Sequence, residues 1–201
     1  MEEQGPQAGK GTGADANTRR RTERAMLELS GQIGFRAIDL EALLVRGGAS
    51  AEQFDSWFDD LEACFTAAYE FEADALCDAM LAASSGAGDW REGTEAALTV
   101  LLRFTAARPD VARALVREVH VVGAAALAKH EEVLERLAAA IGEQCQPPPA
   151  DVSLPWAPSF IVGAVEGVVS GHLDRGEEAE LLDAAPELMD LIATFFVGGG
   201  N

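Results

Sequence analysis

The sequence contains few cysteines. The 201 residues include three of them, at positions 64, 77 and 145, with no CxxC spacing and no nearby histidine. A disulfide framework or a zinc site of the usual spacing therefore has little support. We expect the cysteines to be buried free thiols in a reducing compartment.

Histidines are equally scarce, since the chain has three, and each of them lacks a second histidine or cysteine at i+3 or i+4. No metal site and no cofactor are therefore predicted. His130 precedes two glutamates and is predicted to lie at the surface. The serines show no GxSxG motif, the histidines have no triad spacing, and no glycine-rich phosphate loop follows a strand. We therefore expect that the protein is not an enzyme.

Basic residues and long apolar runs are also lacking. Fifteen Lys and Arg stand against 34 Asp and Glu, a formal net charge of −19. This balance argues against nonspecific binding of nucleic acid or membranes by the whole surface. No apolar run approaches the roughly 18 residues of a spanning helix, and the N-terminus lacks an apolar signal core. We expect a cytoplasmic protein without a membrane partner.

Helical signals dominate what is present. Apolar residues make up 48% of the chain, which excludes general disorder, and they recur at spacings of three and four. An arm without periodicity is predicted for residues 1–17, and the remainder predicts an all-α fold without strands. Nine helices are expected, at about residues 18–33, 40–46, 50–57, 59–83, 91–107, 110–119, 124–141, 156–174 and 177–197. The third and fourth ranges begin with their N-cap residues, Ser50 and Asp59.

The first three helices are short and closely spaced. The second and third are joined by Gly47-Gly48-Ala49-Ser50, small residues that suit a sharp turn between packed helices. This pattern is typical of a helix-turn-helix, although any helical protein can contain three short helices. The expected small core consists of Ile33, Phe35, Leu40, Leu43, Leu44, Phe54, Phe58 and Leu61.

Residues 19–65, RRRTERAMLELSGQIGFRAIDLEALLVRGGASAEQFDSWFDDLEACF, resemble the N-terminal domain of the TetR family of transcriptional regulators. Matching features are a basic arm, Gly34-Phe35, the Gly48-Ala49-Ser50 turn and an acidic cap before a long helix. Pro109, GAVEGV at 163–168 and PEL at 186–188 extend the resemblance. It divides the chain into an arm (1–17), a helix-turn-helix DNA-binding domain (18–60) and a ligand-binding and dimerisation domain (61–201).

The resemblance implies a nine-helix homodimer that binds operator DNA and is released by a small effector. The protein would then be a ligand-responsive transcriptional regulator, most simply a repressor. The residues expected to contact DNA are Arg19, Arg20, Arg21, Arg36, Ser50, Ala51, Glu52, Gln53, Ser56 and Trp57.

Several positions of this block depart from the family pattern. Asp55 stands where the family usually has Tyr, Trp57 where it has His or Tyr, Leu61 where it has Lys, and Asp39 where it has Ser or Thr. Residues 19–65 contain six arginines and nine acidic residues, a net charge of −3. Phosphate contacts supply much of the affinity for DNA, and these substitutions weaken them. The alternative is a dimer that binds small molecules or partners and has a degenerate DNA-binding head.

The resemblance implies a ligand pocket in the second part of the chain, and the apolar residues there would favour a small apolar or aromatic effector. Glu72 interrupts an apolar stripe and is either a pocket acid or an edge residue that reaches water. The other stripe residues fit plain core as well as a pocket. The expected ligand-binding residues are Tyr69, Glu72, Met80, Trp90, Leu101, Phe104 and His120.

Glycine recurs every four residues in the eighth expected helix. Each of the three, at positions 163, 167 and 171, costs the helix about 1 kcal/mol, which suggests that another helix approaches closely. The resemblance implies that this helix and the last one form a dimer interface, and packing within the chain is the alternative. The expected interface residues are Phe160, Gly163, Gly167, Gly171, Leu188, Ile192 and Phe195.

Overall fold

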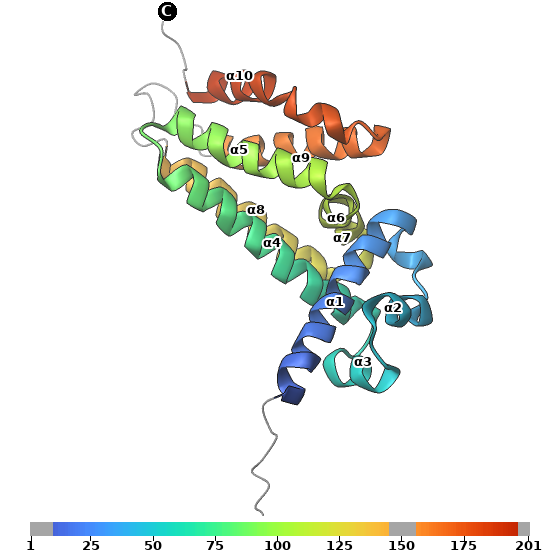
Figure 1. Cartoon of the computed structure of the whole chain (residues 1–201). Helices are drawn as coiled ribbons and strands as arrows, with labels where there is room; N and C mark the ends of the chain where they lie inside the picture. The colour runs from blue at the N-terminus through green and yellow to red at the C-terminus, as the bar shows by residue number, and fades with distance from the viewer. Residues whose placement is uncertain (1–9, 145–155, 197–201) are drawn as a thin grey trace, which may run out of the picture.

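A computed structural model of the chain describes residues 10–144 and 156–196 (Figure 1). These residues form helices joined by short turns and contain no strand, so the all-α prediction is confirmed. Among the described helices, none is both long and apolar enough to cross a bilayer.

The N-terminal unit consists of the first three α-helices, and Figure 1 shows it at one end of the molecule. Helix α1 begins eight residues earlier than predicted, so residues 10–17, which we expected to belong to an arm, are helical. Asp39 caps α2 by accepting a hydrogen bond from the amide of Ala42, and Ser50 and Gln53 form a capping box at α3. The elements are α1 (Lys10–Ile33), the 3₁₀ turn η1 (Phe35–Ala37), α2 (Leu40–Gly47) and α3 (Ala51–Trp57).

The turn between α2 and α3 requires two glycines. A Cβ at Gly47 would lie 2.4 Å from Oγ1 of Thr22 in α1, so only glycine lets the two helices approach this closely. Gly48 has φ of 71°, a left-handed conformation that glycine adopts without strain. The turn therefore has the tight geometry that its sequence predicts.

The remaining helices form the larger part of the molecule. Asp60 caps α4, one residue after the predicted cap Asp59, and the break predicted at Gly123 separates α7 from α8. The last predicted helix, 177–197, is in fact a 3₁₀ helix followed by a shorter α-helix. The elements are α4 (Leu61–Ser85), α5 (Trp90–Ala107), α6 (Pro109–Arg113), the π-helical η2 (Ala114–Glu118), α7 (Val119–Val122), α8 (Ala124–Gln144), α9 (Ala157–Arg175), the 3₁₀ helix η3 (Glu178–Leu182) and α10 (Ala185–Phe196).

Two hydrophobic clusters hold these helices together. The first joins α1–α3 to α4, α7 and α8, and the second joins α5, α9, η3 and α10. The N-terminal unit therefore shares a core with the rest of the chain. Ile33, predicted to be part of the small core, is instead 54% exposed because it lies at the end of α1.

Candidate functional site

A cavity of about 160 Å³ lies between α4, α5, α8 and α9. Its wall is almost entirely apolar, and examples from the four helices are Met80, Leu101, Leu137 and Val165. An enclosed apolar cavity with few polar groups is the usual form of a small-molecule site. A cavity of this volume is large enough for a molecule the size of benzene.

Three polar side chains of the wall, Tyr69, His130 and Glu166, lie together, and Ser84 and Thr94 also line the cavity. The hydroxyl of Tyr69 lies 2.9 Å from Nδ1 of His130, and Nε2 of the same imidazole lies 3.0 Å from Oε1 of Glu166. Burial, and then the nearby Glu166 carboxylate, raise the pKa of Tyr69 above its usual value, so the phenol stays neutral. The residues provide hydrogen-bonding groups in otherwise apolar surroundings.

The structure brings some of the predicted pocket residues together and separates others. Tyr69, Met80 and Leu101 line the cavity. Trp90 and Phe104 do not line it, because they pack against the hydrophobic clusters.

Glu72 is also outside the cavity. Its carboxylate pairs with the guanidinium of Arg108, which donates from both Nη1 and Nη2. Glu72 therefore forms an ion pair that connects α4 to Arg108, the residue between α5 and α6.

His130 and Glu166 are the two site residues that the sequence analysis missed. His130 is 4% exposed, which corrects its predicted surface position. Two signals pointed to them: His130 continues the apolar spacing of Leu127, Leu134 and Leu137, and Glu166 is the only charged residue from 157 to 171. Pairing them required knowledge of how α8 and α9 pack.

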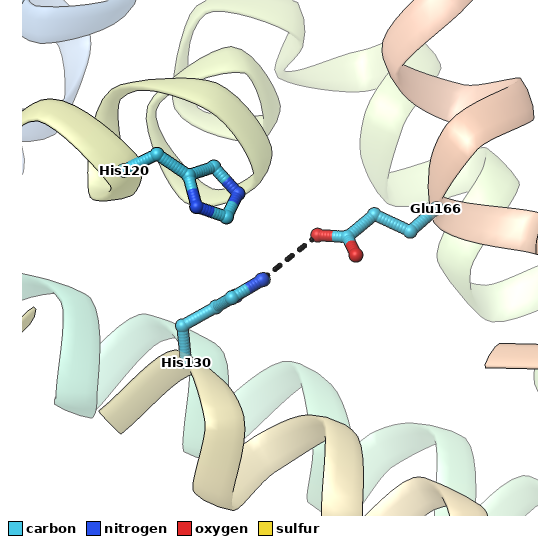
Figure 2. Close-up of side chains that lie close together, drawn as sticks. All are labelled: His120, His130 and Glu166. Carbon is cyan, nitrogen blue, oxygen red and sulfur yellow. Dashed lines mark ion pairs between the residues drawn. The ribbon is translucent and has the colours of Figure 1, made fainter. Parts of the chain in front are cut away.

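His120 lies beside this pair and not in the cavity wall. The chain reverses at Gly123, so α8 carries His130 back toward α7, and the two imidazole ring centroids lie 5.1 Å apart (Figure 2). His120 is exposed and lines an open groove whose other residues include Gly163 and Glu166. Glu166 thus lines both the cavity and the groove.

The three arginines expected to contact DNA, Arg19, Arg20 and Arg21, lie in helix α1, within the range predicted to be helical. Arg19 and Arg20 contact the buried carboxylate of Glu23 at 2.9 and 2.5 Å. Arg20 also stacks on the ring of Phe71 in α4, with its guanidinium carbon 3.7 Å from the ring centroid. Their charges are therefore partly neutralised by contacts within the chain. The third arginine, Arg21, donates to Oγ1 of Thr18 at 3.2 Å.

The face of α3 that was expected to contact DNA is mostly exposed. Its exposed positions include Ala51, Glu52 and Ser56, and Arg36 is exposed nearby in η1. The other two residues are engaged: Gln53 and Trp57 each donate a hydrogen bond of 3.2 Å to the carboxylate of Asp15 in α1. Asp15 was assigned to the arm, so this contact was not predicted.

Several solved structures have a similar arrangement of helices. The FadR fatty acid degradation regulator of Bacillus halodurans has 15% identity and a TM-score of 0.77, over 90% of this chain and 98% of that one. The FadR of Bacillus subtilis, solved with stearoyl-CoA, has 13% identity and a TM-score of 0.77 over the same shares. A TetR-family regulator from Marinobacter aquaeolei VT8 has 20% identity and a TM-score of 0.70, over 89% of this chain and 97% of that one. The chain has the TetR fold.

Sequence comparisons add nothing to this likeness. No protein-family model matches the sequence, and no curated protein matches it. The TetR fold is therefore recognisable from the arrangement of the helices at identities of 20% or less in these three comparisons.

The face of α9 that carries Gly163 and Gly167 is exposed. A Cβ added at Gly163 or Gly167 would meet no atom within 4 Å, and Phe160 is 51% exposed. At Gly171 an added Cβ would lie 3.3 Å from Arg175 of the same helix. No atom of residues 10–144 or 156–196 covers the first two glycines.

Two of the residues assigned to the dimer interface are buried inside the chain. Leu188 and Ile192 are 4% and 3% exposed and belong to the second hydrophobic cluster. They are core residues because α10 turns this face toward α5 and α9. The side chain of Phe195 lies outside the described residues.

Two of the cysteines are confirmed as buried free thiols, Cys64 and Cys77. Burial raises the pKa of Cys64 to about 12, and it also raises the pKa of Cys77, which lines the cavity. Neither thiol is a thiolate at neutral pH. Cys145 lies outside the described residues.

Proposed function

We propose that the protein is a ligand-responsive DNA-binding transcriptional regulator that acts as a homodimer and leaves its operator when a small effector binds. The observation that carries the proposal is the course of α4. This uninterrupted helix begins four residues after α3 ends and lines the cavity from Tyr69 to Ser84. A molecule that displaces α4 in the cavity also moves the end of α4 that adjoins α3.

The effector that fits best is a small aromatic or apolar molecule with one polar group. The cavity is mostly apolar, its charged and aromatic polar groups are Tyr69, His130 and Glu166, and the carboxylate favours a ligand that donates a hydrogen bond. The FadR of Bacillus subtilis was solved with stearoyl-CoA, which carries a long apolar chain. The volume here supports a smaller molecule in this state of the cavity.

DNA binding is tested by fluorescence anisotropy on DNA from upstream of the protein's own gene, with unrelated DNA as the control, over a salt series. Specific binding with a steep salt dependence supports the regulator. Equal or absent binding to both DNAs at low salt contradicts binding to this upstream site.

Effector binding is tested with indole and indene, which have the same shape but differ in the N–H donor. Ligand-observed NMR, on protein treated with a chelator to remove any bound metal, should show tighter binding of indole than of indene. Ala140→Phe fills the cavity and should abolish binding, whereas Ala139→Phe, an exposed neighbour on α8, should not. Equal binding by the two variants would place the ligand elsewhere.

Homodimer formation through α9 is tested with Gly167→Arg. An added Cβ meets nothing within 4 Å inside the chain, so the variant should fold normally. Sedimentation velocity should show a dimer for the wild type and a monomer for the variant. Arginine at Gly13, another helical glycine with open surroundings, is the matched control. A variant that stays dimeric would move the interface away from this face.

The contacts of the arginines favour a second candidate, a ligand-binding dimer with a degenerate head. Arg19 and Arg20 are paired with Glu23, and Arg46 contacts Glu28 at 2.9 Å. Asp55 is exposed on α3, where it would repel phosphate. Indole binding and dimer formation without affinity for any DNA would favour this candidate.

A further inference from the structure

We propose that His120, His130 and Glu166 form a binding site for a divalent transition-metal cation of the zinc class. The three residues come from α7, α8 and α9, and one donor atom of each lies within 4.8 Å of the other two. Figure 2 shows the two imidazoles and the carboxylate converging on a common space. Two nitrogens and one carboxylate oxygen form a ligand set that zinc accepts, whereas magnesium and calcium prefer oxygen alone.

The polar atoms of this cluster are left unsatisfied. Nε2 of His130 and Oε1 of Glu166 are buried, and neither has a hydrogen-bond partner in the described part of the chain, although they lie 3.0 Å apart. Buried polar atoms are normally paired. A cation placed against both atoms would accept a lone pair from each of them.

Tyr69 orients the imidazole for this role. Its hydroxyl contacts Nδ1 of His130 at 2.9 Å. When Nδ1 donates its proton to the phenol oxygen, Nε2 presents a lone pair to the metal. Metal-bound histidines commonly use their second nitrogen in this way.

His120 completes the set from the outer side. Its side chain is exposed and lines the groove with Glu166 and Gly167, so a cation in solvent can reach the site. Ligand atoms around tetrahedral zinc lie about 3.3 Å apart, as follows from bonds of about 2.0 Å. The donor atoms here lie up to 4.8 Å apart, and rotation of the exposed His120 side chain would bring its nitrogen closer to the other two donor atoms. Arg117, the cationic residue of this groove, is paired with Asp174.

Cobalt(II) and zinc(II) titrations of the metal-free full-length protein test the proposal. We expect one equivalent of Co²⁺ per chain with the visible absorption bands of a four- or five-coordinate site, and displacement by Zn²⁺. His120→Ala and Glu166→Gln should each weaken Zn²⁺ binding by about 100-fold or more, and Tyr69→Phe by about 10-fold. The control is His172→Ala, which should bind normally; Nδ1 of His172 lies 2.9 Å from the carbonyl oxygen of Val168.

Three outcomes would overturn the site. These are the absence of one-to-one binding, unchanged affinity in His120→Ala, and a sulfur-to-cobalt charge-transfer band, which would assign the metal to cysteine. If Glu166→Gln fails to fold, as judged by circular dichroism, exposed His120 still decides the question. The experiment uses no DNA and no organic ligand, so its failure leaves the proposed regulator untouched.

Discussion

The N-terminal unit and the cavity region differ in how their contacts are built. In α1–α3 the caps and the turn are set by residues close in sequence, such as the Ser50–Gln53 box and the Gly47-Gly48 pair. In the cavity, the wall combines side chains from α4, α5, η2, α8, α9 and α10, between residues 69 and 192. The first region is specified by local chemistry and the second by packing, so changes in each should report on different properties.

Replacement of Gly31 should have the largest effect, because this residue joins the two regions. A Cβ at Gly31 in α1 would lie 1.8 Å from the carbonyl oxygen of Asp110 in α6. Gly31→Ala should therefore lower the free energy of unfolding by about 3 kcal/mol, despite the better helix propensity of alanine. Urea denaturation followed by circular dichroism measures this.

Gly13→Ala is the matched control on the same helix. An added Cβ there meets nothing within 4 Å, so the variant should be as stable as the wild type or gain up to about 1 kcal/mol. Equal stability of the two variants would show that α1 and α6 separate easily. The two regions would then be less tightly coupled than the shared hydrophobic cluster implies.

The double variant Asp55→Tyr with Leu61→Lys should strengthen binding to upstream DNA by at least 10-fold. Each restored phosphate contact contributes about 1.5–3 kcal/mol, and the lysine should steepen the salt dependence by about one unit. Glu131→Lys, an exposed change in α8 with the same gain of two charges, controls for net charge. An equal gain in both would mean that only overall charge limits binding.

The local region was the more predictable from sequence. The α2–α3 turn, the caps Asp39 and Ser50 and the break at Gly123 all depend on residues within a few positions of each other. The meeting of His130 with Tyr69 and Glu166 depends on how three helices pack, over separations of 61 and 36 residues. Periodicity placed His130 on an apolar face of its helix but could not show which helix it would meet.

Asp15→Ala should produce a smaller gain in DNA affinity, about fivefold to tenfold. The change frees Gln53 and Trp57 and removes a negative charge from the exposed face of α3. A typical hydrogen bond is worth about 1 kcal/mol net, which corresponds to a gain of this size. Anisotropy on upstream DNA measures the gain. Asp15→Asn keeps an acceptor without the charge and separates the two causes. A loss of affinity in the Ala variant would instead make Asp15 a support for α3.

Glu72→Gln should have the smallest effect, and it tests where the cavity ends. The carboxylate pairs with a partly exposed Arg108, so its removal should cost no more than about 1 kcal/mol in the free energy of unfolding. Indole affinity, measured by ligand-observed NMR, should stay unchanged because Glu72 lies outside the wall. Leu101→Ala, a change within the wall, should alter that affinity. A loss of indole binding in Glu72→Gln would extend the site beyond the cavity wall, toward the contact between α4 and the α5–α6 junction.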